Sequence, residues 1–416
     1  MSELYERFLR CGAVSTDTRS IAPGSLFFAL RGASFDGNRF AAEALDRGAA
    51  CAVVDDPSAA VAGRTILVDD TLRALQELAR EHRRALGIPI LAIAGSNGKT
   101  TTKELVARVV ARRYAVYATR GNLNNHIGVP LTLLAMTRAT EFGVVETGAS
   151  ACGEIALLAS IAEPDYGILT NIGRSHLEGF GGPEGIRRGK GELLDYLAAR
   201  GGRAFVRRDD PVLASMAAER PGLAVEWYTA NEAEGFPSQL EGDYNRFNVA
   251  AAVAVGRRLG IADEEIRRAV AGYAPDNNRS QRLATERNTL VVDCYNANPS
   301  SMQASVSNFL AEPLGSRTRR VLILGDMLEL GRWSADEHAA VLRQAAASPD
   351  AELLLVGGEF ARACEGLAAG ERPARVRCYP TRHELLAALR SEPIDNAFVL
   401  VKGSHGIGLE HAIEEL

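Results

Sequence analysis

The stretch 91–104, LAIAGSNGKTTTKE, constrains the fold of this chain more than any other feature. An apolar run of strand length enters a turn containing Gly95 and Gly98, and a helical pattern follows from Lys99. This order directs backbone N–H groups and the positive end of a helix toward one point, an arrangement that binds polyphosphates. The full phosphate-loop pattern is G-x-x-x-x-G-K-[ST], and here Ile93 occupies the position of its first glycine. The sequence thus predicts a shortened phosphate-binding loop inside an α/β domain.

Four residues in and beyond this loop are candidates for metal-dependent phosphate chemistry. Lys99 is expected to reach the β- and γ-phosphates of a nucleotide, and the Thr100 hydroxyl is expected to bind Mg²⁺. Glu146 follows the apolar FGVV and His176 lies beyond the apolar YGIL, so both are predicted near strand ends beside the loop. From the residues alone, Glu146 can also be a solvated carboxylate at a strand end, and His176 a structural histidine.

Composition excludes several classes of protein. The chain has 416 residues, 46% hydrophobic and 24% charged, which is typical of a globular protein of two or three domains. Its net charge is −5 and it has no basic stripe, so nucleic acid is not an expected partner. The start, MSELYERF, does not resemble a signal peptide, and no apolar run is long enough for membrane insertion. Six cysteines without C-x-x-C pairs indicate a reducing cytoplasm.

Apolar runs of strand length alternate with amphipathic helical stretches along the whole chain, which predicts α/β domains with mostly parallel sheets. A charged stretch ending near Gly87 and a polar stretch at 274–282 mark two boundaries. We therefore expect three domains in series, at 1–86, 87–278 and 279–416. The third domain is expected to be a small doubly wound sheet with strands in TLVVD, RRVLILG, AELLLV and NAFVLVK. Asn277 and Asn278 are the predicted hinge.

Five motifs in this order resemble the Mur ligase family, ATP-dependent amide-forming enzymes of peptidoglycan precursor synthesis. They are AGSNGKTTT, GNLNNHIGVPLTLL, ETGAS, TNIGRSHLEGFG and GKGEL. The shortened G-x-x-G-K-T-T loop is the form found in that family, where it serves the activation of a carboxylate as an acyl phosphate. The resemblance implies a UDP-binding N-terminal α/β domain, a central P-loop ATPase domain and a Rossmann-like C-terminal domain.

The outer domains resemble one branch of the family. VSTDTRS and ASFDGNRF are similar to the UDP-binding motifs of its later-acting members, with Asn38 in place of a histidine. DCYNANPSS and ILGDMLELG are similar to motifs of ligases that add D-alanyl-D-alanine to UDP-N-acetylmuramoyl-tripeptide, and the D-N-P-R motif of ligases for diamino acids is missing. Two positions depart from the family pattern: Tyr244 replaces the histidine of G-x-H-N, and His405 replaces the arginine of K-G-S-R.

The resemblance implies a role for each matching residue. The implied ATP site comprises Gly95, Ser96, Asn97, Gly98, Lys99, Thr100, Thr101 and Asn124. The implied UDP-substrate contacts are Ser15, Asp17, Arg19, Asp36 and Asn38. The implied dipeptide contacts are Tyr295, Asn296 and Asn298. The implied catalytic set is Lys99, Glu146, His176 and Lys190, and two Mg²⁺ ions are expected on Thr100, Glu146, His176 and Lys190, the last carrying CO₂ as a carbamate.

These features predict a cytoplasmic, monomeric ligase that joins D-alanyl-D-alanine to UDP-N-acetylmuramoyl-tripeptide in two steps. The substrate carboxylate first takes the γ-phosphoryl group of ATP, and the dipeptide amine then displaces phosphate. Three alternatives stay open on the sequence: another ligase of the superfamily, either diamino-acid-adding or folylpolyglutamate synthase-like; a P-loop regulatory ATPase; and a family member that only binds its ligands.

Overall fold

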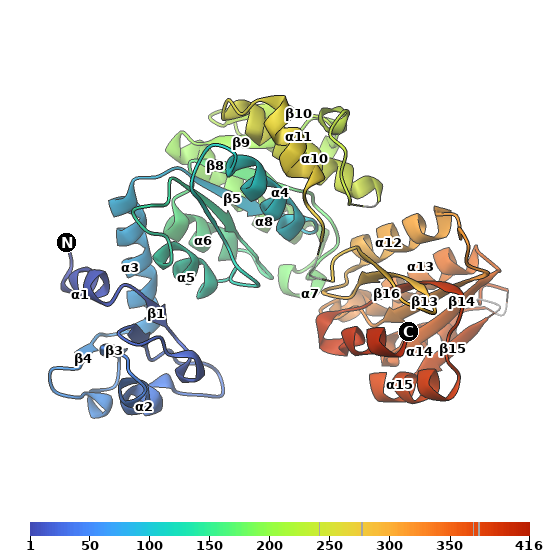
Figure 1. Cartoon of the computed structure of the whole chain (residues 1–416), viewed down its shortest axis with the longest axis horizontal. Coiled ribbons are helices and arrows are strands. Elements are labelled where there is room, and N and C mark those ends of the chain that lie inside the picture. Colours follow the sequence, from blue (N-terminus) through green and yellow to red (C-terminus); the bar gives the residue numbers. More distant parts are fainter. Residues whose placement is uncertain (241, 276–277, 369, 373–374) are drawn as a thin grey trace.

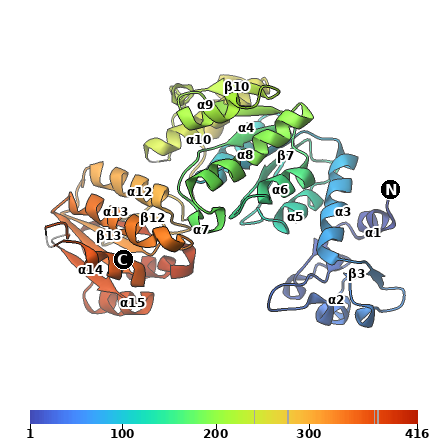
Figure 2. The same cartoon turned by 180° about the vertical axis from the view of Figure 1, so that it is seen from behind.

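Three α/β units follow one another along the chain and lie in a row (Figures 1 and 2). The computed structural model describes residues 1–240, 242–275, 278–368, 370–372 and 375–416. Each unit has its own sheet, of four, six and six strands, so the predicted three-domain α/β architecture is confirmed. In the described part of the chain, no helix has both the length and the apolar character needed to cross a bilayer.

The N-terminal unit is a small parallel sheet in the order β1-β2-β3-β4. Its strands are β1 (Val14–Ser15), β2 (Leu26–Phe28), β3 (Cys51–Val54) and β4 (Thr65–Leu67). Its helices are α1 (Glu3–Cys11), α2 (Ala41–Asp46) and α3 (Thr71–Leu86). Strands β2 and β3 are buried at every position because helices cover both faces of the sheet, and this explains their continuous apolar sequence.

The central unit is a fully parallel sheet in the order β10-β9-β8-β5-β7-β6. Its strands are β5 (Ile90–Ala94), β6 (Val116–Ala118), β7 (Phe142–Glu146), β8 (Tyr166–Leu169), β9 (Arg203–Arg207) and β10 (Ala224–Tyr228). Its helices are α4 (Lys99–Val110), α5 (Gly128–Leu134), α6 (Glu154–Ala162), α7 (Leu177–Phe180), α8 (Pro183–Arg200), α9 (Pro211–Ala218), α10 (Asp243–Arg258) and α11 (Asp263–Ala271).

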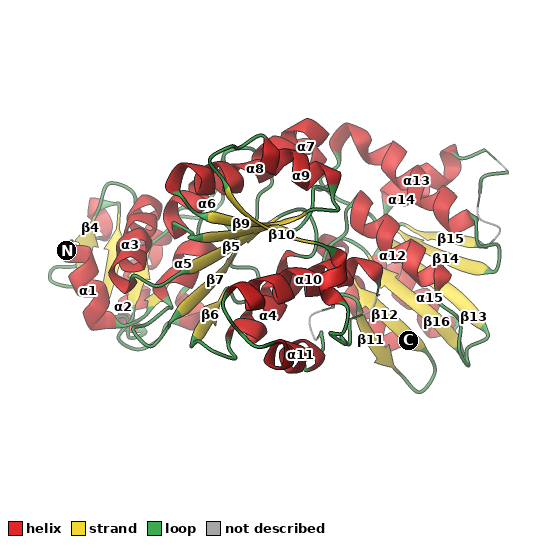
Figure 3. Cartoon of the chain, turned by 90° about the horizontal axis from the view of Figure 1, so that it is seen from above, coloured by secondary structure: helices red, strands yellow, loops and turns green. Residues whose placement is uncertain are grey.

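The position of strand β5 in the sheet determines where the ligand-binding loop of this unit lies. Its side chains alternate between two cores: Leu91 and Ile93 pack with α4, α10 and α11, and Ala92 packs with α5, α6 and α8 on the other face (Figure 3). The chain continues from β5 to β6 and β7 on one side, and then to β8, β9 and β10 on the other. The loop after β5 therefore lies at the topological switch point, where open α/β sheets bind ligands.

The C-terminal unit is a mixed sheet in the order β11-β12-β16-β13-β14-β15. Its strands are β11 (Gln281–Ala284), β12 (Thr289–Asp293), β13 (Arg319–Gly325), β14 (Ala351–Val356), β15 (Val376–Tyr379) and β16 (Ala397–Lys402). Its helices are α12 (Pro299–Ala311), α13 (Ser334–Ala346), α14 (Gly358–Gly366) and α15 (Arg382–Ser391). The four predicted strands form a parallel core, and β11 adds an antiparallel edge.

The predicted polar linker at 274–282 ends inside β11, so its last two residues belong to the sheet. This edge strand was missed because its side chains are half exposed and its sequence, QRLA, is polar. Of the predicted hinge residues, Asn277 lies outside the described residues, and Asn278 has a left-handed backbone with φ 55°.

Helix α3 joins the first two units (Figure 1). Asp70 caps its start, and Gly87, with φ 63°, ends it in the left-handed conformation that glycine adopts without strain. Near its end the buried Arg83 donates to the carbonyl oxygens of Ala162 and Ile88 at 3.1 and 3.0 Å, and to the Asp165 carboxylate at 2.8 Å. One guanidinium thus fastens α3 to the end of α6 and to the approach of β5.

Arg83→Met should lower the free energy of unfolding by roughly 2–3 kcal/mol, because it keeps the apolar stem but leaves a carboxylate and buried carbonyls without their donor. Denaturant unfolding followed by circular dichroism measures the loss. Arg84→Met is the matched control, because the Arg84 side chain is 62% exposed and the loss of its ion pair with Glu163 should cost under about 1 kcal/mol. Equal losses in the two variants would contradict the anchoring role.

Candidate active site

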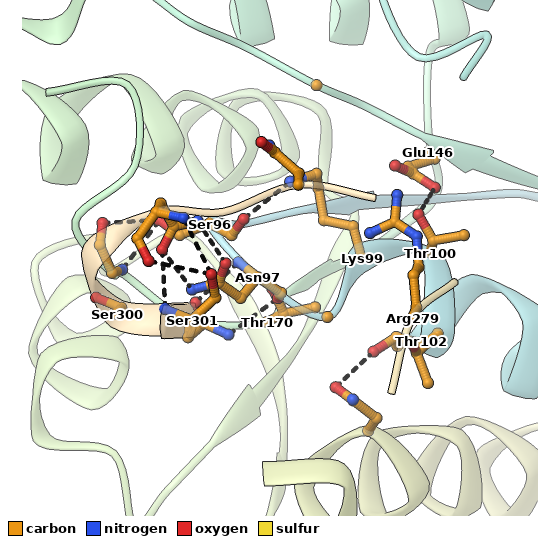
Figure 4. Close-up of a pocket in the computed structure, with 18 of the residues that line it drawn as sticks. Ser96, Asn97, Lys99, Thr100, Thr102, Glu146, Thr170, Arg279, Ser300 and Ser301 are labelled. Carbon is orange, nitrogen blue, oxygen red and sulfur yellow. Dashed lines mark hydrogen bonds between the residues drawn. The ribbon is translucent and has the colours of Figure 1, made fainter. Parts of the chain in front are cut away.

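A cavity of about 880 Å³ lies where the central and C-terminal units meet, and it contains most of the predicted site (Figure 4). From the central unit it takes the loop after β5, the loop before α5 and the ends of β7 and β8. From the C-terminal unit it takes the segment 293–305 and Lys402. The arrangement therefore brings the predicted ATP residues and the predicted dipeptide residues to one space.

The loop after β5 is shaped to bind an anion. Gly95 has φ 134°, and a Cβ there would lie 2.0 Å from the Thr170 hydroxyl, so only glycine fits. Helix α4 begins directly at Lys99 with no side-chain cap, which leaves its first N–H groups directed toward the cavity. The Lys99 ammonium donates to the carbonyls of Gly95 and Ser96 at 2.8 and 3.2 Å. Burial lowers the pKa of Lys99, and the nearby Glu146 opposes that shift.

The rest of the loop is held by β8 and by α10. Ser96 Oγ donates to the Gly173 carbonyl at 2.9 Å, and the Asn97 N–H donates to Asn171 Oδ1 at 3.1 Å. Thr101 is buried and lines the cavity. A Cβ at Gly98, where φ is 78°, would lie 2.6 Å from an amide oxygen of α10. Seven of the eight predicted ATP residues line the cavity, and Gly95 is the exception.

Thr100, Glu146 and Asn124 form one hydrogen-bonded group beside Lys99 (Figure 4 shows the first two). The Thr100 hydroxyl donates to Glu146 Oε2 at 3.0 Å, and Asn124 Nδ2 donates to Oε1 of the same carboxylate at 2.9 Å. Glu146 is only 2% exposed. A hydroxyl and a buried carboxylate at the mouth of a phosphate loop are hard oxygen donors, which suits Mg²⁺.

His176 lines the same cavity and lies at the boundary between the central and C-terminal units. Its backbone is left-handed, with φ 51°, and its Nδ1 contacts the carboxylate of Glu329 from the C-terminal unit. Burial lowers the pKa of His176, although Glu329 opposes the shift. A second pair crosses the same boundary: Arg174 donates to Glu337 at 2.6 Å. Glu329 was not predicted, although it stands in the DMLELG motif.

Lys190 lies behind the cavity wall. Its side chain is 1% exposed, and its ammonium donates to the carbonyl of Ala149, which does line the cavity, at 2.8 Å. The ring of Phe180 lies 4.9 Å from the same nitrogen. Burial, reinforced by repulsion from Lys99, lowers the pKa of Lys190 to about 7. This lysine is therefore poised to lose its proton near neutral pH.

The predicted metal residues Thr100, Glu146, His176 and Lys190 are a hydroxyl, a carboxylate, an imidazole and an amine. In the described chain, no three His, Cys, Asp or Glu side chains gather in a way that could hold a metal. The Thr100–Glu146 pair provides protein oxygens that need phosphate oxygens or water to complete a shell. His176 provides an imidazole nitrogen as a possible metal ligand. Lys190 provides an amine, which carries no oxygen donor of its own.

The predicted UDP residues all belong to the N-terminal unit, and none of them lines the cavity. Asp17 accepts from Arg19 through both carboxylate oxygens, at 2.9 and 2.7 Å, and this hydrogen bonding lowers the pKa of Asp17 to about 2. The Ser15 hydroxyl donates to the Asp17 carbonyl at 3.0 Å.

Asp36 and Asn38 belong to a second group on the same unit. Asn38 donates from its side chain to Asp36 at 2.8 Å and to Asp55 at 2.7 Å. Asp55 also accepts from the Thr71 N–H at 3.1 Å, which connects this group to the start of α3. Arg31 joins the group through Asp55 at 2.8 Å. Asp55 was missed because it is distant in sequence from the motif, and Arg31 because it stands just outside the motif, five positions before Asp36.

The predicted dipeptide residues follow β12. Tyr295 and Asn296 line the cavity, and Asn296 Oδ1 accepts from the next backbone N–H at 2.8 Å. Asn298 caps α12 by accepting from the Ser301 N–H at 3.0 Å. Its amide also donates to Asn97 Oδ1 at 2.7 Å and so contacts the phosphate loop directly. The signal for this cap, Asn-Pro-x-Ser, was present in the sequence.

Comparison with known proteins agrees with this arrangement. Three family descriptions match in chain order: "Mur ligase family, catalytic domain" at 11–83, "Mur ligase middle domain" at 93–235 and "Mur ligase, glutamate ligase domain" at 278–405. The UDP-N-acetylmuramoyl-tripeptide--D-alanyl-D-alanine ligase of Bacillus subtilis is 35% identical, over 99% of this chain and 94% of its own length.

Two solved structures have the same fold. MurF from Acinetobacter baumannii superposes with a TM-score of 0.84 at 28% identity, covering 97% of this chain and 93% of its own. MurF from Thermotoga maritima, solved in complex with ADP, gives 0.83 at 24% identity, covering 100% and 98%. With all three domains matched in order and one relative similar along nearly its whole length, this chain belongs to the Mur ligase family.

Proposed function

We propose that this chain is the ATP-dependent ligase that adds D-alanyl-D-alanine to UDP-N-acetylmuramoyl-tripeptide in peptidoglycan synthesis. The observation that carries the proposal is the 35% identity with the Bacillus subtilis ligase of that name across 99% of the chain. The cavity supports it, because the phosphate loop and the loop after β12 face the same space. ATP binding follows from membership of the family.

The first step that we propose transfers the γ-phosphoryl group of ATP to the carboxylate of the UDP-linked peptide. A carboxylate oxygen attacks the γ-phosphorus, and the bond between the γ-phosphorus and the oxygen that bridges it to the β-phosphate breaks. ADP is released, and the peptide becomes an acyl phosphate. Lys99 and the first N–H groups of α4 offset the negative charge that spreads over the transferring group. Lys99 donates to the loop carbonyls of Gly95 and Ser96, and we propose that it exchanges them for phosphate oxygens when the nucleotide binds.

The second step joins the dipeptide. Its amine attacks the acyl carbon, phosphate leaves, and the amine loses a proton. We propose that Tyr295, Asn296 and the loop capped by Asn298 hold the dipeptide, because this loop lies at the carboxyl end of β12 and contacts the phosphate loop through Asn97. A cavity shared by two domains also limits access of water to the acyl phosphate.

Mg²⁺ would bind to Thr100 and Glu146 together with phosphate oxygens, and when bound it would neutralise phosphate charge. For a second ion we propose His176 and a carbamate on Lys190. The lowered pKa of Lys190, about 7, supports the carbamate because only a neutral amine adds CO₂. A lysine with the usual pKa of ~10.4 would be neutral in fewer than about one molecule in a thousand at pH 7.

We assign the remaining parts as follows. Residues 1–86 form the UDP-substrate domain with Ser15, Asp17, Arg19, Asp36 and Asn38; residues 87–278 form the ATP domain, and residues 279–416 form the dipeptide domain. We propose that the chain acts as a monomer. Since the reaction consumes ATP, we propose the cytoplasm as its compartment.

The assay that tests the function combines the purified protein with ATP, Mg²⁺ and UDP-N-acetylmuramoyl-tripeptide, with either D-alanyl-D-alanine or single amino acids. Phosphate should be released only when the UDP-linked acid is present, and the ligated product should form only with the dipeptide. Phosphate release without the acid would indicate a regulatory ATPase. Product formed with a single diamino acid or with glutamate would indicate another ligase of the superfamily.

Lys190→Ala should lower turnover by roughly 100-fold or more, because it removes the carbamate's anionic oxygens from the site. Added short carboxylates should restore part of the activity. Lys190→Arg is the matched control, because it keeps a cation that cannot add CO₂. Carbon NMR of protein equilibrated with ¹³C-labelled bicarbonate gives a second readout: a carbamate signal in the parent protein, lost in both variants. A parent protein without that signal would contradict the carbamate.

Asn296→Ala should raise the KM for the dipeptide about fivefold, the equivalent of one neutral hydrogen bond worth ~1 kcal/mol. The KM values for ATP and for the UDP-linked substrate should stay unchanged. Steady-state kinetics with each substrate varied in turn measures all three. Asn231→Ala, an exposed asparagine of the central domain, is the control. A defect equal in all three constants would assign the loop a structural role only.

A further inference from the structure

The turn that carries His176 is held from the neighbouring domain. Helix α7, which begins directly after His176, lies next to the C-terminal unit in Figures 1 and 2. The carboxylate of Glu329 contacts His176 Nδ1, and the carbonyl of the same glutamate accepts from the Glu178 N–H at 3.3 Å. Two residues before His176, the Arg174 N–H donates to Ser300 Oγ at 2.8 Å. The C-terminal domain therefore fixes both the ring and the backbone of this turn.

The two residues that meet in this contact both have a strained backbone. His176 has φ 51° and Glu329 has φ 61°, and neither is a glycine. Left-handed residues of this kind cost free energy, persist only where surrounding contacts hold them, and gather at functional sites. The turn of Glu329 is held within its own domain, because the N–H of the preceding Leu328 donates to Ser404 Oγ at 3.0 Å. Two strained turns thus place a carboxylate opposite a ring nitrogen.

The contact determines which nitrogen of His176 carries the proton. A neutral imidazole has one N–H and one lone pair, and the nitrogen that faces a carboxylate keeps the N–H. The lone pair is then on Nε2, which has no hydrogen-bond partner among the residues that the structure describes. His176 also lines the cavity. Carboxylates commonly hold metal-binding histidines in this way, because they fix the orientation of the ring and raise its basicity.

We propose that Glu329 is a positioning residue for His176: it fixes the tautomer with the proton on Nδ1 and so leaves Nε2 for a divalent cation in the cavity. Glu329 belongs to the C-terminal domain, so His176 is held in this way only where the two domains meet. The inference rests on the proposed function in taking His176 as a metal ligand. The tautomer itself is measured without ligation, so failure of the inference can be told from failure of the proposed function.

Nitrogen NMR of protein labelled with ¹⁵N-histidine tests the tautomer in the absence of metal, nucleotide and turnover. The chain has seven histidines, and His176→Gln identifies the signals of His176 by their loss. In mildly alkaline buffer the parent protein should carry the proton on Nδ1. Glu329→Ala should move a large part of the population to the other tautomer, whereas Glu329→Gln keeps an acceptor and should stay mostly in the parent form. A proton on Nε2 in the parent, or unchanged populations in Glu329→Ala, would overturn the proposal.

Manganese binding measures the consequence for the cation. Electron paramagnetic resonance counts the Mn²⁺ ions bound to protein that carries a non-hydrolysable ATP analogue, and the ion lost in His176→Gln is the one bound by this histidine. The Kd of that ion should rise about tenfold in Glu329→Ala, as is typical when such a carboxylate is removed, and about threefold in Glu329→Gln. An Mn²⁺ count that His176→Gln leaves unchanged would overturn the metal-ligand role of His176, and the inference with it.

Glu178→Gln is the matched control for charge. Glu178 is exposed and lies two residues after His176, so the variant removes one negative charge from the same surroundings and leaves Nδ1 its partner. It should bind Mn²⁺ with the Kd of the parent protein. Equal losses of affinity in Glu178→Gln and Glu329→Ala would show that net charge alone matters and would contradict the positioning role.

Discussion

The pairing of Asn97 with Asn298 is the contact on which the proposed site depends. Two amides, one from the phosphate loop and one from the cap of α12, meet across a domain boundary. The cavity exists only where these two domains meet, and neither domain alone provides both the phosphate loop and the loop after β12. The Arg174–Glu337 and His176–Glu329 contacts lie along the same boundary. The proposed reaction transfers a phosphoryl group to a carboxylate and then forms an amide at the same carboxyl group. It therefore depends on the relative position of the central and C-terminal sheets.

Two buried lysines are the second constraint. Lys99 and Lys190 repel each other, both are desolvated, and the pKa of each is lowered. Buried charge is costly, so an anion that binds beside either lysine would be favoured. For Lys99 the proposed anion is a phosphate. For Lys190 the proposed anion is a carbamate formed on its own side chain, which changes the charge of that side chain from positive to negative.

The sequence predicted those parts of the fold and site that depend on local order. The phosphate loop could be identified because strand, glycines, lysine and helix are contiguous, and the four apolar strands of the third domain because they are buried. Strands β11 and β15 were missed because they are partly exposed. Asp55 approaches the predicted residues only through tertiary packing, so spacing along the chain carried no signal for it. Glu329 and Arg31 stand inside or next to the motifs, but the sequence did not show which side chains they would contact. Asn298 was predicted as a ligand contact, and the structure shows that its amide also caps a helix.

Helix α3 connects the N-terminal domain to the central domain as one rigid element. Its start is tied to the Asp36–Asn38–Asp55 group, and its end is fastened by Arg83 to the central domain. Sixteen residues at 1.5 Å each form a rod of ~24 Å. Tilting that rod by about 5° would displace its far end by ~2 Å, more than a reacting carboxylate can tolerate. With the UDP-linked substrate bound where we propose, the stiffness of this one helix would determine how accurately the acid end of the substrate is positioned.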